Sequence, residues 1–546
     1  MRYQKLIKLF IASIILFSFI SCRRPATEEN ILYEAIYSQP QSFDPRDPVD
    51  AETYGIMYTI YNTLVEIDDS LKIQPALAYK WITNDFKEWK FFIRNDAFFK
   101  PDPCFGESKT KKLTAYDIEF SLNRSLKPGG TGAFMLTDIV EGAEEVNTGK
   151  ADKASGITAI DSFTLVIRLK KPYAKLLERL AMPFFFIVSK DAVEFYKDKY
   201  PLNPVGTGAF MIEKIDPGNA IYLKKNPYFW KKDEDNNKLP YIDKITFRIL
   251  KNPQLALNEF IAGKLSAVEI QPIQANLIFD EKGGLKNEFK KFKIAENIAL
   301  DVHFFAFKMD EPPFKNNKPL RQAINYAVDK NAIANNILNK FATPAVGVLP
   351  PSVFPEYKRK LPYEYNPDLA KKILKDAKID PQKIPPITLY IDNKPTTEAV
   401  AQFVVSNLNN IGLKINIKKM DFSTLLGEVV QGNPKFYYMY WEGTDPNPEI
   451  FMIQFKSDLL PEKGGYNFGR YNNPTADKLY DQAVSTLDPE ISKKIWLKLD
   501  SLLVNDAPWL FLYHTKRIRL LQPNIINYDN NPMQIRRYYY TKFTKN

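Results

Sequence analysis

The amino-acid sequence predicts an α/β protein with two lobes. Residues 245–270 and residues 387–417 each show a strand, a helix and a second strand in succession. Units of this kind ordinarily build parallel sheets. They lie further apart along the chain than one such sheet usually extends, so we expect them in different lobes. The length of 546 residues also exceeds what a single core supports.

The first unit begins with a strand at 245–249, where apolar and polar residues alternate. Residues 254–262 predict a short helix, and Gly263 stands where a left-handed residue often ends a helix. The chain is again strand-like at 265–270. We therefore expect two strands that run parallel and a helix that connects them.

The second unit has the same order with a longer helix. Apolar residues predict a strand at 387–391 and alternate in the next strand at 413–417. The helix between them spans 396–411 and ends at Gly412. Its core-facing side consists of apolar residues at helical spacing, namely Val400, Phe403, Val404, Leu408 and Ile411.

The part of the chain before the first unit is richer in strands. Residues 81–99 are aromatic and strand-like, and residues 161–169 form a further strand candidate. We therefore expect a β-rich subdomain inserted in the first lobe.

The N-terminus has the layout of an export signal. Basic residues precede the uncharged apolar stretch 9–20, which is too short to span a bilayer as a stable helix. Small Ser21 then precedes Cys22, an arrangement that resembles a bacterial lipoprotein signal with an acylated cysteine. We expect residues 1–21 to be removed and the exported chain to be anchored at Cys22, on the periplasmic or cell-surface side. The alternatives are an ordinary cleaved signal and an uncleaved anchor.

Composition excludes several classes of function. The formal charge is +11, but Lys and Arg are dispersed among acidic residues, so we expect no nucleic-acid partner. The chain has two cysteines and two histidines, and His303 and His514 both stand in strand-like apolar surroundings. We therefore expect no metal and no cofactor. We also expect no enzyme activity, because a nucleophile elbow and a phosphate-binding loop are absent, although abundant carboxylates leave a glycosidase pair open.

Several segments, read in order, resemble the bacterial extracellular solute-binding family that serves peptide and nickel ABC importers. The opening S-L-D-P segment of that family has a counterpart at 38–45, and its L-T-A-x-D pattern has one at 113–121. Its N-P-V-G-T-G turn is similar to 203–210, and its V-R-Q-A-I-N-Y-A helix to 320–327. The resemblance covers nearly the whole chain after the signal.

The resemblance implies the two-lobed periplasmic-binding-protein fold, in which the lobes close around a ligand at a hinge that the chain crosses twice. It agrees with the α/β pattern and with the inserted β-rich subdomain. The implied division of the chain is a signal peptide at 1–21, a first segment of lobe I at 22–63, the inserted subdomain at 64–185, a second segment of lobe I at 186–300, lobe II at 301–512 and a C-terminal segment of lobe I at 513–546.

The resemblance also implies a ligand-binding segment at 440–448. In peptide-binding members of the family, a tryptophan is followed three residues later by an aspartate that pairs with the α-ammonium group of the peptide. Here Trp441 keeps its place, Thr444 holds the position of the aspartate, and Asp445 is displaced by one residue. A hydroxyl cannot replace a carboxylate opposite a buried ammonium, so either Asp445 or Glu442 makes the pair or the ligand has no amine there. Asp445 could instead form only an Asx turn, and Trp441 could be a core residue.

A loop of the first lobe that contains Tyr37, Ser38 and Gln39 resembles a segment that meets the ligand backbone, with a plain turn as the alternative. Nickel is disfavoured because neither histidine stands in a matching motif. We expect a lipid-anchored, monomeric binding protein that captures an oligopeptide and delivers it to the permease subunits of an ABC importer. The alternatives are a binder of a non-peptide solute such as an oligosaccharide, and a surface adhesin or receptor that reuses the fold.

Overall fold

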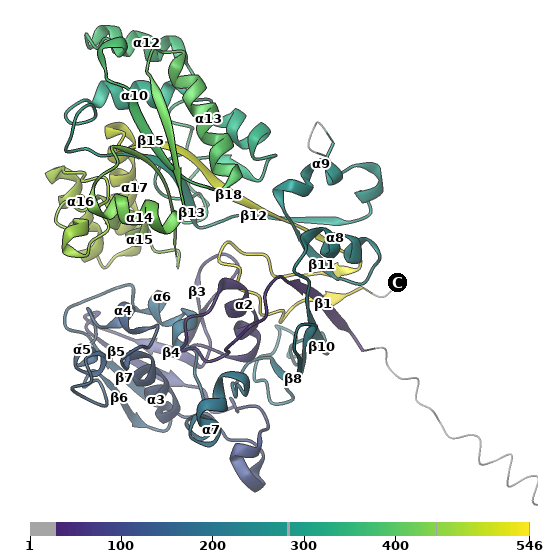
Figure 1. Cartoon of the computed structure of the whole chain (residues 1–546). Helices are drawn as coiled ribbons and strands as arrows, with labels where there is room; N and C mark the ends of the chain where they lie inside the picture. The colour runs from purple at the N-terminus through teal and green to yellow at the C-terminus, as the bar shows by residue number, and fades with distance from the viewer. Residues whose placement is uncertain (1–28, 281–283, 444, 545–546) are drawn as a thin grey trace, which may run out of the picture.

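The computed structural model describes residues 29–280, 284–443 and 445–544. They form two bodies that lie one above the other in Figure 1 and are joined on one side by extended strands. We call the lower body lobe I and the upper body lobe II. Cys22 and Thr444 lie outside the described residues, so the lipid anchor at Cys22 stays a prediction. No helix in the described part of the chain is long and apolar enough to cross a membrane.

Lobe I contains two four-stranded sheets that share one hydrophobic core with helices α2 and α3. The first sheet has the order β1-β10-β9-β8, with β1 parallel to β10 and the other neighbours antiparallel. The second, β4-β5-β7-β6, is antiparallel throughout and is the β-rich subdomain that the sequence predicts. The bounds are β1 Ile31–Ile36, α2 Ala51–Ile60, β2 Val65–Ile67, β3 Ile73–Pro75, β4 Ala78–Ile82, β5 Glu88–Ile93, α3 Ala115–Leu126, α4 Ala133–Leu136, α5 Ala143–Asn147, β6 Ile157–Asp161, β7 Thr164–Arg168, α6 Leu176–Leu180, α7 Lys190–Tyr196, β8 Phe210–Asp216 and β9 Ala220–Lys225.

The first predicted unit forms its elements but not its parallel pair. β10 (Lys244–Ile249), α8 (Pro253–Ile261) and β11 (Ala267–Ile270) follow the predicted ranges closely, and Gly263 has a positive φ of 75°. However, β11 pairs antiparallel with β18 (Trp509–Leu521), while β10 pairs with β1. The prediction of two parallel partner strands is therefore wrong here, because the N-terminal strand β1 occupies the place beside β10.

The second predicted unit is confirmed. β15 (Ile387–Asp392) and β16 (Ile415–Met420) pair in parallel, and α13 (Pro395–Asn409) connects them. The apolar face of α13 packs into the core beside this sheet, as its spacing predicts. The residues of this face that are buried include Val400, Val404 and Leu408.

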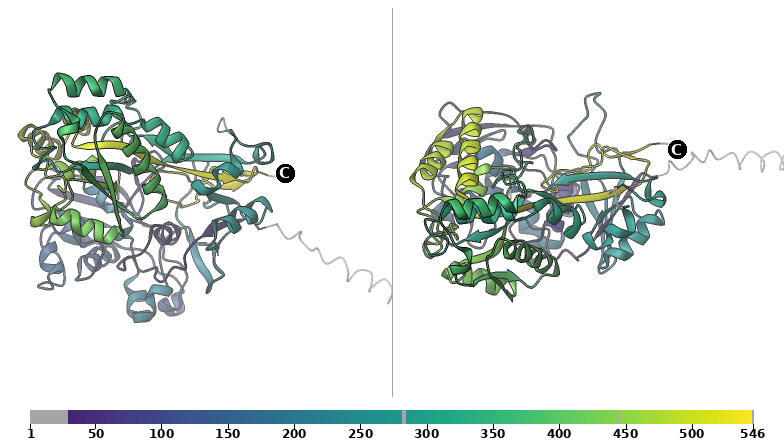
Figure 2. Two further views of the ribbon diagram at one scale, coloured as in Figure 1. Left: turned by 45° about the horizontal axis from the view of Figure 1, so that its top comes forward. Right: turned by 90° about the horizontal axis from the view of Figure 1, so that it is seen from above.

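Lobe II is built on a mixed sheet whose two faces carry separate cores. β13 (Asp301–Phe307) and β17 (Phe436–Glu442) are antiparallel neighbours near its centre. Because successive strand residues point to opposite faces, Phe436 and Tyr438 belong to one core and Tyr437 to the other. Helices pack on both sides of the sheet, as the view from above shows (Figure 2). Their bounds are α10 Lys318–Ala327, α12 Pro367–Asp376, α14 Phe422–Gln431, α15 Pro448–Met452, α16 Pro474–Ser485 and α17 Pro489–Asp506.

Two strands carry the chain between the lobes. β12 (Lys293–Ile298) pairs with the second half of β18, whose first half pairs with β13 of lobe II. Figures 1 and 2 show β12 and β18 side by side between the two bodies. Asp301 fixes this crossing: its carboxylate accepts a hydrogen bond from the backbone N–H of Thr515 at 2.8 Å, and its carbonyl oxygen lies 2.6 Å from His514 Nδ1. His303 and His514 both lie in strands, as predicted.

Candidate functional site

The segment at the end of β17 carries the residues that the sequence places at the ligand. Trp441 is half-buried and packs against the core that also contains Tyr437. Its indole Nε1 donates a hydrogen bond to the carbonyl oxygen of Ile450 at 2.9 Å. Its ring meets that of Tyr466 edge to face, with 5.5 Å between the ring centroids. Trp441 is therefore held in one orientation, with part of its ring in the core and part at the surface.

Asp445 points into the protein, and only 1% of its surface is exposed. Its Oδ1 accepts a hydrogen bond from the backbone N–H of Asn447 at 2.7 Å, which is the Asx turn that the sequence leaves open as an alternative. Burial raises the pKa of the Asp445 carboxyl to about 7. The N–H of Asn447 and the guanidinium of Arg179 lower this pKa, while the carboxylates of Glu178 and Glu449 raise it. In this arrangement Asp445 is not presented to solvent.

Glu442 is an exposed carboxylate of the same segment. It is the last residue of β17, and 56% of its side chain is exposed. Its Oε1 accepts a hydrogen bond at 3.3 Å from Arg517, which belongs to the connecting strand β18. Arg517 also donates to the carbonyl oxygen of Pro532 at 3.3 Å. Glu442 thus lies where lobe II meets the connection, and its carboxylate is exposed to solvent. Thr444 lies outside the described residues.

The predicted loop of lobe I is a turn whose polar groups bond within that lobe. The carboxylate of Glu52 accepts hydrogen bonds from the backbone N–H of Tyr37 at 2.9 and 3.0 Å, and from that of Ser38 at 3.3 Å. The side-chain oxygen of Gln39 accepts a hydrogen bond from the backbone N–H of Gly218 at 2.9 Å. Burial raises the pKa of Tyr37 to about 12. These hydrogen bonds hold the turn against the rest of lobe I.

The structure brings some predicted residues together and keeps others apart. Trp441, Glu442 and Asp445 lie in one segment of lobe II, whereas the turn at 37–39 lies in lobe I. Among the described residues no hydrogen bond joins this turn to residues 441–449. A ligand that touches both would therefore have to lie between the lobes.

Aromatic residues of lobe I form a second surface toward lobe II. Phe134 of α4 is 64% exposed, and its ring meets that of Phe184 edge to face at 5.5 Å. Phe184 in turn meets Tyr54 of α2 at 5.7 Å. Figure 1 shows α2 and α4 on the side of lobe I that faces lobe II. The sequence gives no indication of this surface, because the three rings come from three segments without a shared pattern.

A group of buried charges ties β18 to lobe I. The guanidinium of Arg519 pairs with Glu269 of β11, and 2% of the Arg519 side chain is exposed. Arg536 lies 3.8 Å from Glu269 and 3.9 Å from Glu34. Burial alone would raise the pKa of Glu269, but Arg519 and Arg536 outweigh it and lower this pKa below its ordinary value. The connection is thus anchored in lobe I by ion pairs between largely buried side chains.

A cavity of about 1050 Å³ lies between the two lobes. Residues 69–72 line it from lobe I, residues 351–356 from lobe II, and Asn297 from the connection. Its wall is mixed, with the apolar side chains of Leu71 and Phe354 beside charged groups. A space of this size is ordinary for a site that accepts a small molecule. None of the predicted ligand residues lines it, so it adds to the interlobe space without identifying the ligand.

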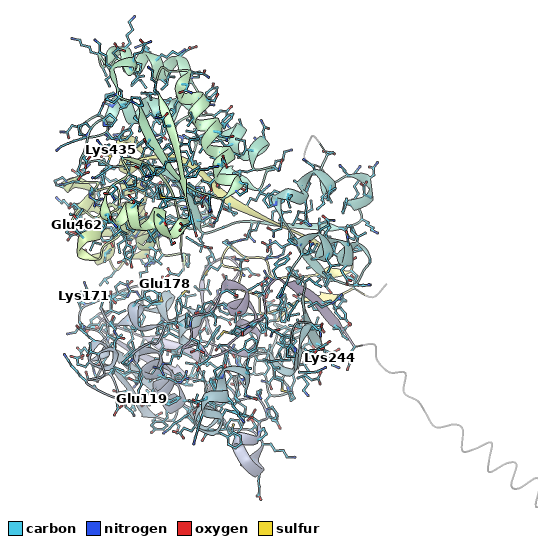
Figure 3. All side chains as sticks on the ribbon, in the orientation of Figure 1. Glu119, Lys171, Glu178, Lys244, Lys435 and Glu462 are labelled. Carbon is cyan, nitrogen blue, oxygen red and sulfur yellow. The ribbon has the colours of Figure 1, made fainter. Side chains whose placement is uncertain are left out.

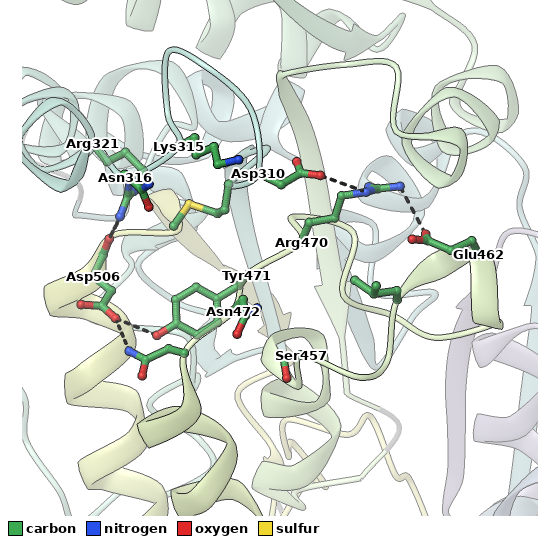
Figure 4. Close-up of a pocket in the computed structure, with 13 residues that line it drawn as sticks. Asp310, Lys315, Asn316, Arg321, Ser457, Glu462, Arg470, Tyr471, Asn472 and Asp506 are labelled. Carbon is green, nitrogen blue, oxygen red and sulfur yellow. Dashed lines mark hydrogen bonds and ion pairs between the residues drawn. The ribbon is translucent and has the colours of Figure 1, made fainter.

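A second cavity, of about 710 Å³, lies entirely within lobe II (Figure 4). In it the carboxylate of Asp506 accepts a hydrogen bond from the hydroxyl of Tyr471 at 2.7 Å, and Arg470 lies 3.4 Å from Glu462. The charged groups of this pocket therefore compensate one another. Across the described part of the chain, no group of three or more His, Cys, Asp or Glu side chains could hold a metal ion.

Comparisons with known proteins agree with this architecture. The model of the bacterial extracellular solute-binding proteins, family 5 (middle part), matches residues 72–459. The heme-binding protein A of Haemophilus influenzae is 26% identical over 515 residues, which cover 90% of this chain and 88% of that protein. The periplasmic murein peptide-binding protein MppA of Escherichia coli is 25% identical over 526 residues, which cover 93% and 92%. Among solved structures, the unliganded open form of the murein tripeptide-binding protein MppA matches with a TM-score of 0.81 and 23% identity, over 94% of this chain and 98% of that one.

Proposed function

This chain belongs to family 5 of the bacterial extracellular solute-binding proteins, and from that premise we propose that it captures oligopeptides between its lobes and delivers them to the permease of an ABC importer. The observation that carries the proposal is the family match over residues 72–459, and a relative named for murein peptides agrees with it. The architecture supports it, because two lobes joined by two strands can close around a solute. The chain would bind and release its solute without covalent chemistry.

We assign the ligand contacts as follows. The exposed part of Trp441 and the rings of Phe134 and Tyr54 would form aromatic walls on the two sides of the solute. The turn at Tyr37, Ser38 and Gln39 would meet the backbone of the peptide from lobe I. Aromatic walls and a few placed polar groups are the usual means by which an enclosed site holds a small molecule.

Glu442 is our choice for the partner of the α-ammonium group of the peptide. Its carboxylate reaches solvent, whereas that of Asp445 is buried in an Asx turn and has a raised pKa. An ammonium group that leaves water needs a charged partner, since an uncompensated buried charge costs about 3–5 kcal/mol. Asp445 would shape the segment and would contact the ligand only if the turn opened.

The cellular setting belongs to the same proposal. Residues 1–21 would be removed on export, and lipid on Cys22 would hold the monomeric protein at the membrane beside its permease. The division into lobe I, inserted subdomain and lobe II at the boundaries given above would separate the moving parts.

A tetrapyrrole is the second candidate solute, because the curated relative at 26% identity is named a heme-binding protein. Exposed aromatic rings such as Phe134 would also suit a flat apolar ligand. The two candidates differ in the need for a carboxylate: a peptide amine requires Glu442, and a tetrapyrrole does not.

Native mass spectrometry of the chain from Ala26 onward tests the proposal. The protein is sprayed as purified from its own cells, and the released ligand is fragmented. Masses that break into amino-acid residues support peptide capture. A released ligand that has the mass of a tetrapyrrole and absorbs visible light would contradict the proposal. A ligand that fragments into a series of hexoses would contradict it as well.

A further inference from the structure

A tyrosine of lobe I forms a hydrogen bond with a carboxylate of lobe II. Tyr173 lies between β7 and α6, and its hydroxyl donates a hydrogen bond to Glu449 Oε2 at 3.3 Å. Only 3% of the Tyr173 surface is exposed. On the lobe I side, Arg179 Nε donates to the same hydroxyl oxygen at 3.0 Å. The hydroxyl therefore stands between a cation of one lobe and a carboxylate of the other, which strengthens both bonds.

Glu449 is also held within its own lobe. Its other carboxylate oxygen accepts a hydrogen bond from the hydroxyl of Tyr480 at 3.4 Å. The side-chain amide of Asn447 donates to Oε2 at 3.4 Å. Two tyrosines thus donate hydrogen bonds to the same carboxylate, Tyr173 from lobe I and Tyr480 from within lobe II. Replacing either tyrosine by phenylalanine therefore gives a matched pair of variants.

The contact lies far from the connecting strands. Figure 1 shows α6 and α15 facing each other across the space between the lobes, on the side away from β12 and β18. Figure 3 labels Glu178, the neighbour of Arg179, at the edge of lobe I that faces lobe II. A hydrogen bond far from the hinge restrains the rotation of one lobe relative to the other more than the same bond beside the hinge would, because the lever arm is longer.

Glu449 directly follows the predicted ligand-binding segment 440–448. The indole of Trp441 donates to Ile450, the residue after Glu449, and the N–H of Glu449 donates to the side chain of Asn447 at 3.1 Å. Asn447 also bonds to Asp445. Hydrogen bonds within lobe II therefore join Asp445, Asn447 and Glu449, and Tyr173 attaches Glu449 to lobe I.

We propose that the Tyr173–Glu449 contact is an interlobe latch that holds the ligand-binding segment of lobe II against lobe I before the solute arrives. Its effect on affinity rests on the proposed function, whereas its effect on the lobes does not. Without the latch, the ligand-free lobes spread over a wider range of angles. A smaller fraction of the protein molecules then has the lobe arrangement that can bind the solute. The apparent affinity for the solute decreases in proportion to this fraction.

The test compares Tyr173→Phe with Tyr480→Phe. Each variant loses one hydroxyl bond to Glu449, but only the first loses a bond between lobes. Spin labels are placed on Lys150→Cys of lobe I and Lys375→Cys of lobe II, in the chain from Ala26 onward with Cys104→Ser. Electron–electron resonance then gives the distribution of distances between the lobes without ligand.

Tyr173→Phe should lengthen and broaden this distribution, and Tyr480→Phe should leave it unchanged. Glu449→Ala removes the acceptor of the same hydrogen bond and should shift the distance distribution as Tyr173→Phe does. It serves as the second variant if Tyr173→Phe does not fold. Identical distributions in all variants would overturn the latch, whatever the protein binds. For a peptide mixture, Tyr173→Phe should weaken binding about threefold to tenfold, as expected for one hydrogen bond. If the distribution shifts but no peptide binds in any variant, the latch stands and the proposed function fails.

Discussion

Replacing Asp445 by Asn should make the stability of the protein less dependent on pH. Burial raises the pKa of this carboxyl to about 7 in the folded chain, whereas the unfolded chain has the ordinary value of 3.8. Between these values the folded form holds a proton that the unfolded form has lost. The free energy of unfolding of the wild type therefore falls as pH rises from about 4 to about 7. Asn cannot ionise, so the variant lacks this fall.

The magnitude follows from the size of the pKa shift. A shift of about three units, at about 1.36 kcal/mol for each unit, corresponds to about 4 kcal/mol for this buried group. Asn retains a side-chain oxygen that can accept the hydrogen bond from the N–H of Asn447, so the Asx turn stays in place. Relative to the wild type, Asp445→Asn should thus gain about 4 kcal/mol in the free energy of unfolding between about pH 4 and about pH 8.

Urea denaturation at several pH values, followed by tryptophan fluorescence, measures this difference because Trp441 lies in the same segment. Glu442→Gln is the matched control, because it removes a neighbouring carboxylate of the same segment whose side chain is 56% exposed. If Asp445→Asn and Glu442→Gln show the same small dependence on pH, Asp445 is solvated and the geometry of this turn is refuted.

Three further variants test other parts of the account. Trp441→Ala should weaken solute binding at least tenfold while the protein stays folded. If calorimetry shows that the variant binds the solute as tightly as the wild type does, Trp441 is not part of the site. Glu442→Gln should weaken the binding of peptides with a free amine more than tenfold and leave N-acetylated peptides unaffected; equal losses for both classes would exclude its role as the amine partner. Arg519→Ala should lower the free energy of unfolding by about 1.5–3 kcal/mol, because it removes the closest cation of the Glu269 carboxylate and leaves only Arg536 at 3.8 Å, and a melting temperature equal to that of the wild type would contradict this.

Local patterns predicted the elements of the fold well. The strand–helix–strand order at 387–417 is confirmed because neighbouring segments of the chain complete it by themselves. The first unit shows the limit of such reasoning. Its helix and strands form, but β1, more than two hundred residues earlier in the chain, takes the place beside β10. Pairing between distant strands depends on tertiary packing and leaves no local periodicity.

The candidate site was predicted in part. The resemblance directed attention to Trp441 and Asp445, but only the structure shows that Asp445 turns inward and that Glu442 is exposed. The sequence leaves an Asx turn and a ligand contact equally open, because an aspartate can serve in either role. The Tyr173–Glu449 contact could not be foreseen, because two residues far apart in the chain share no pattern.

A calorimetric titration of the chain from Ala26 onward with synthetic peptides of defined length tests whether the protein captures peptides. We expect saturable binding of one peptide per chain, with unblocked peptides preferred over their N-acetylated counterparts. Absence of binding for peptides of every length, while a tetrapyrrole or an oligosaccharide binds one to one, would contradict it.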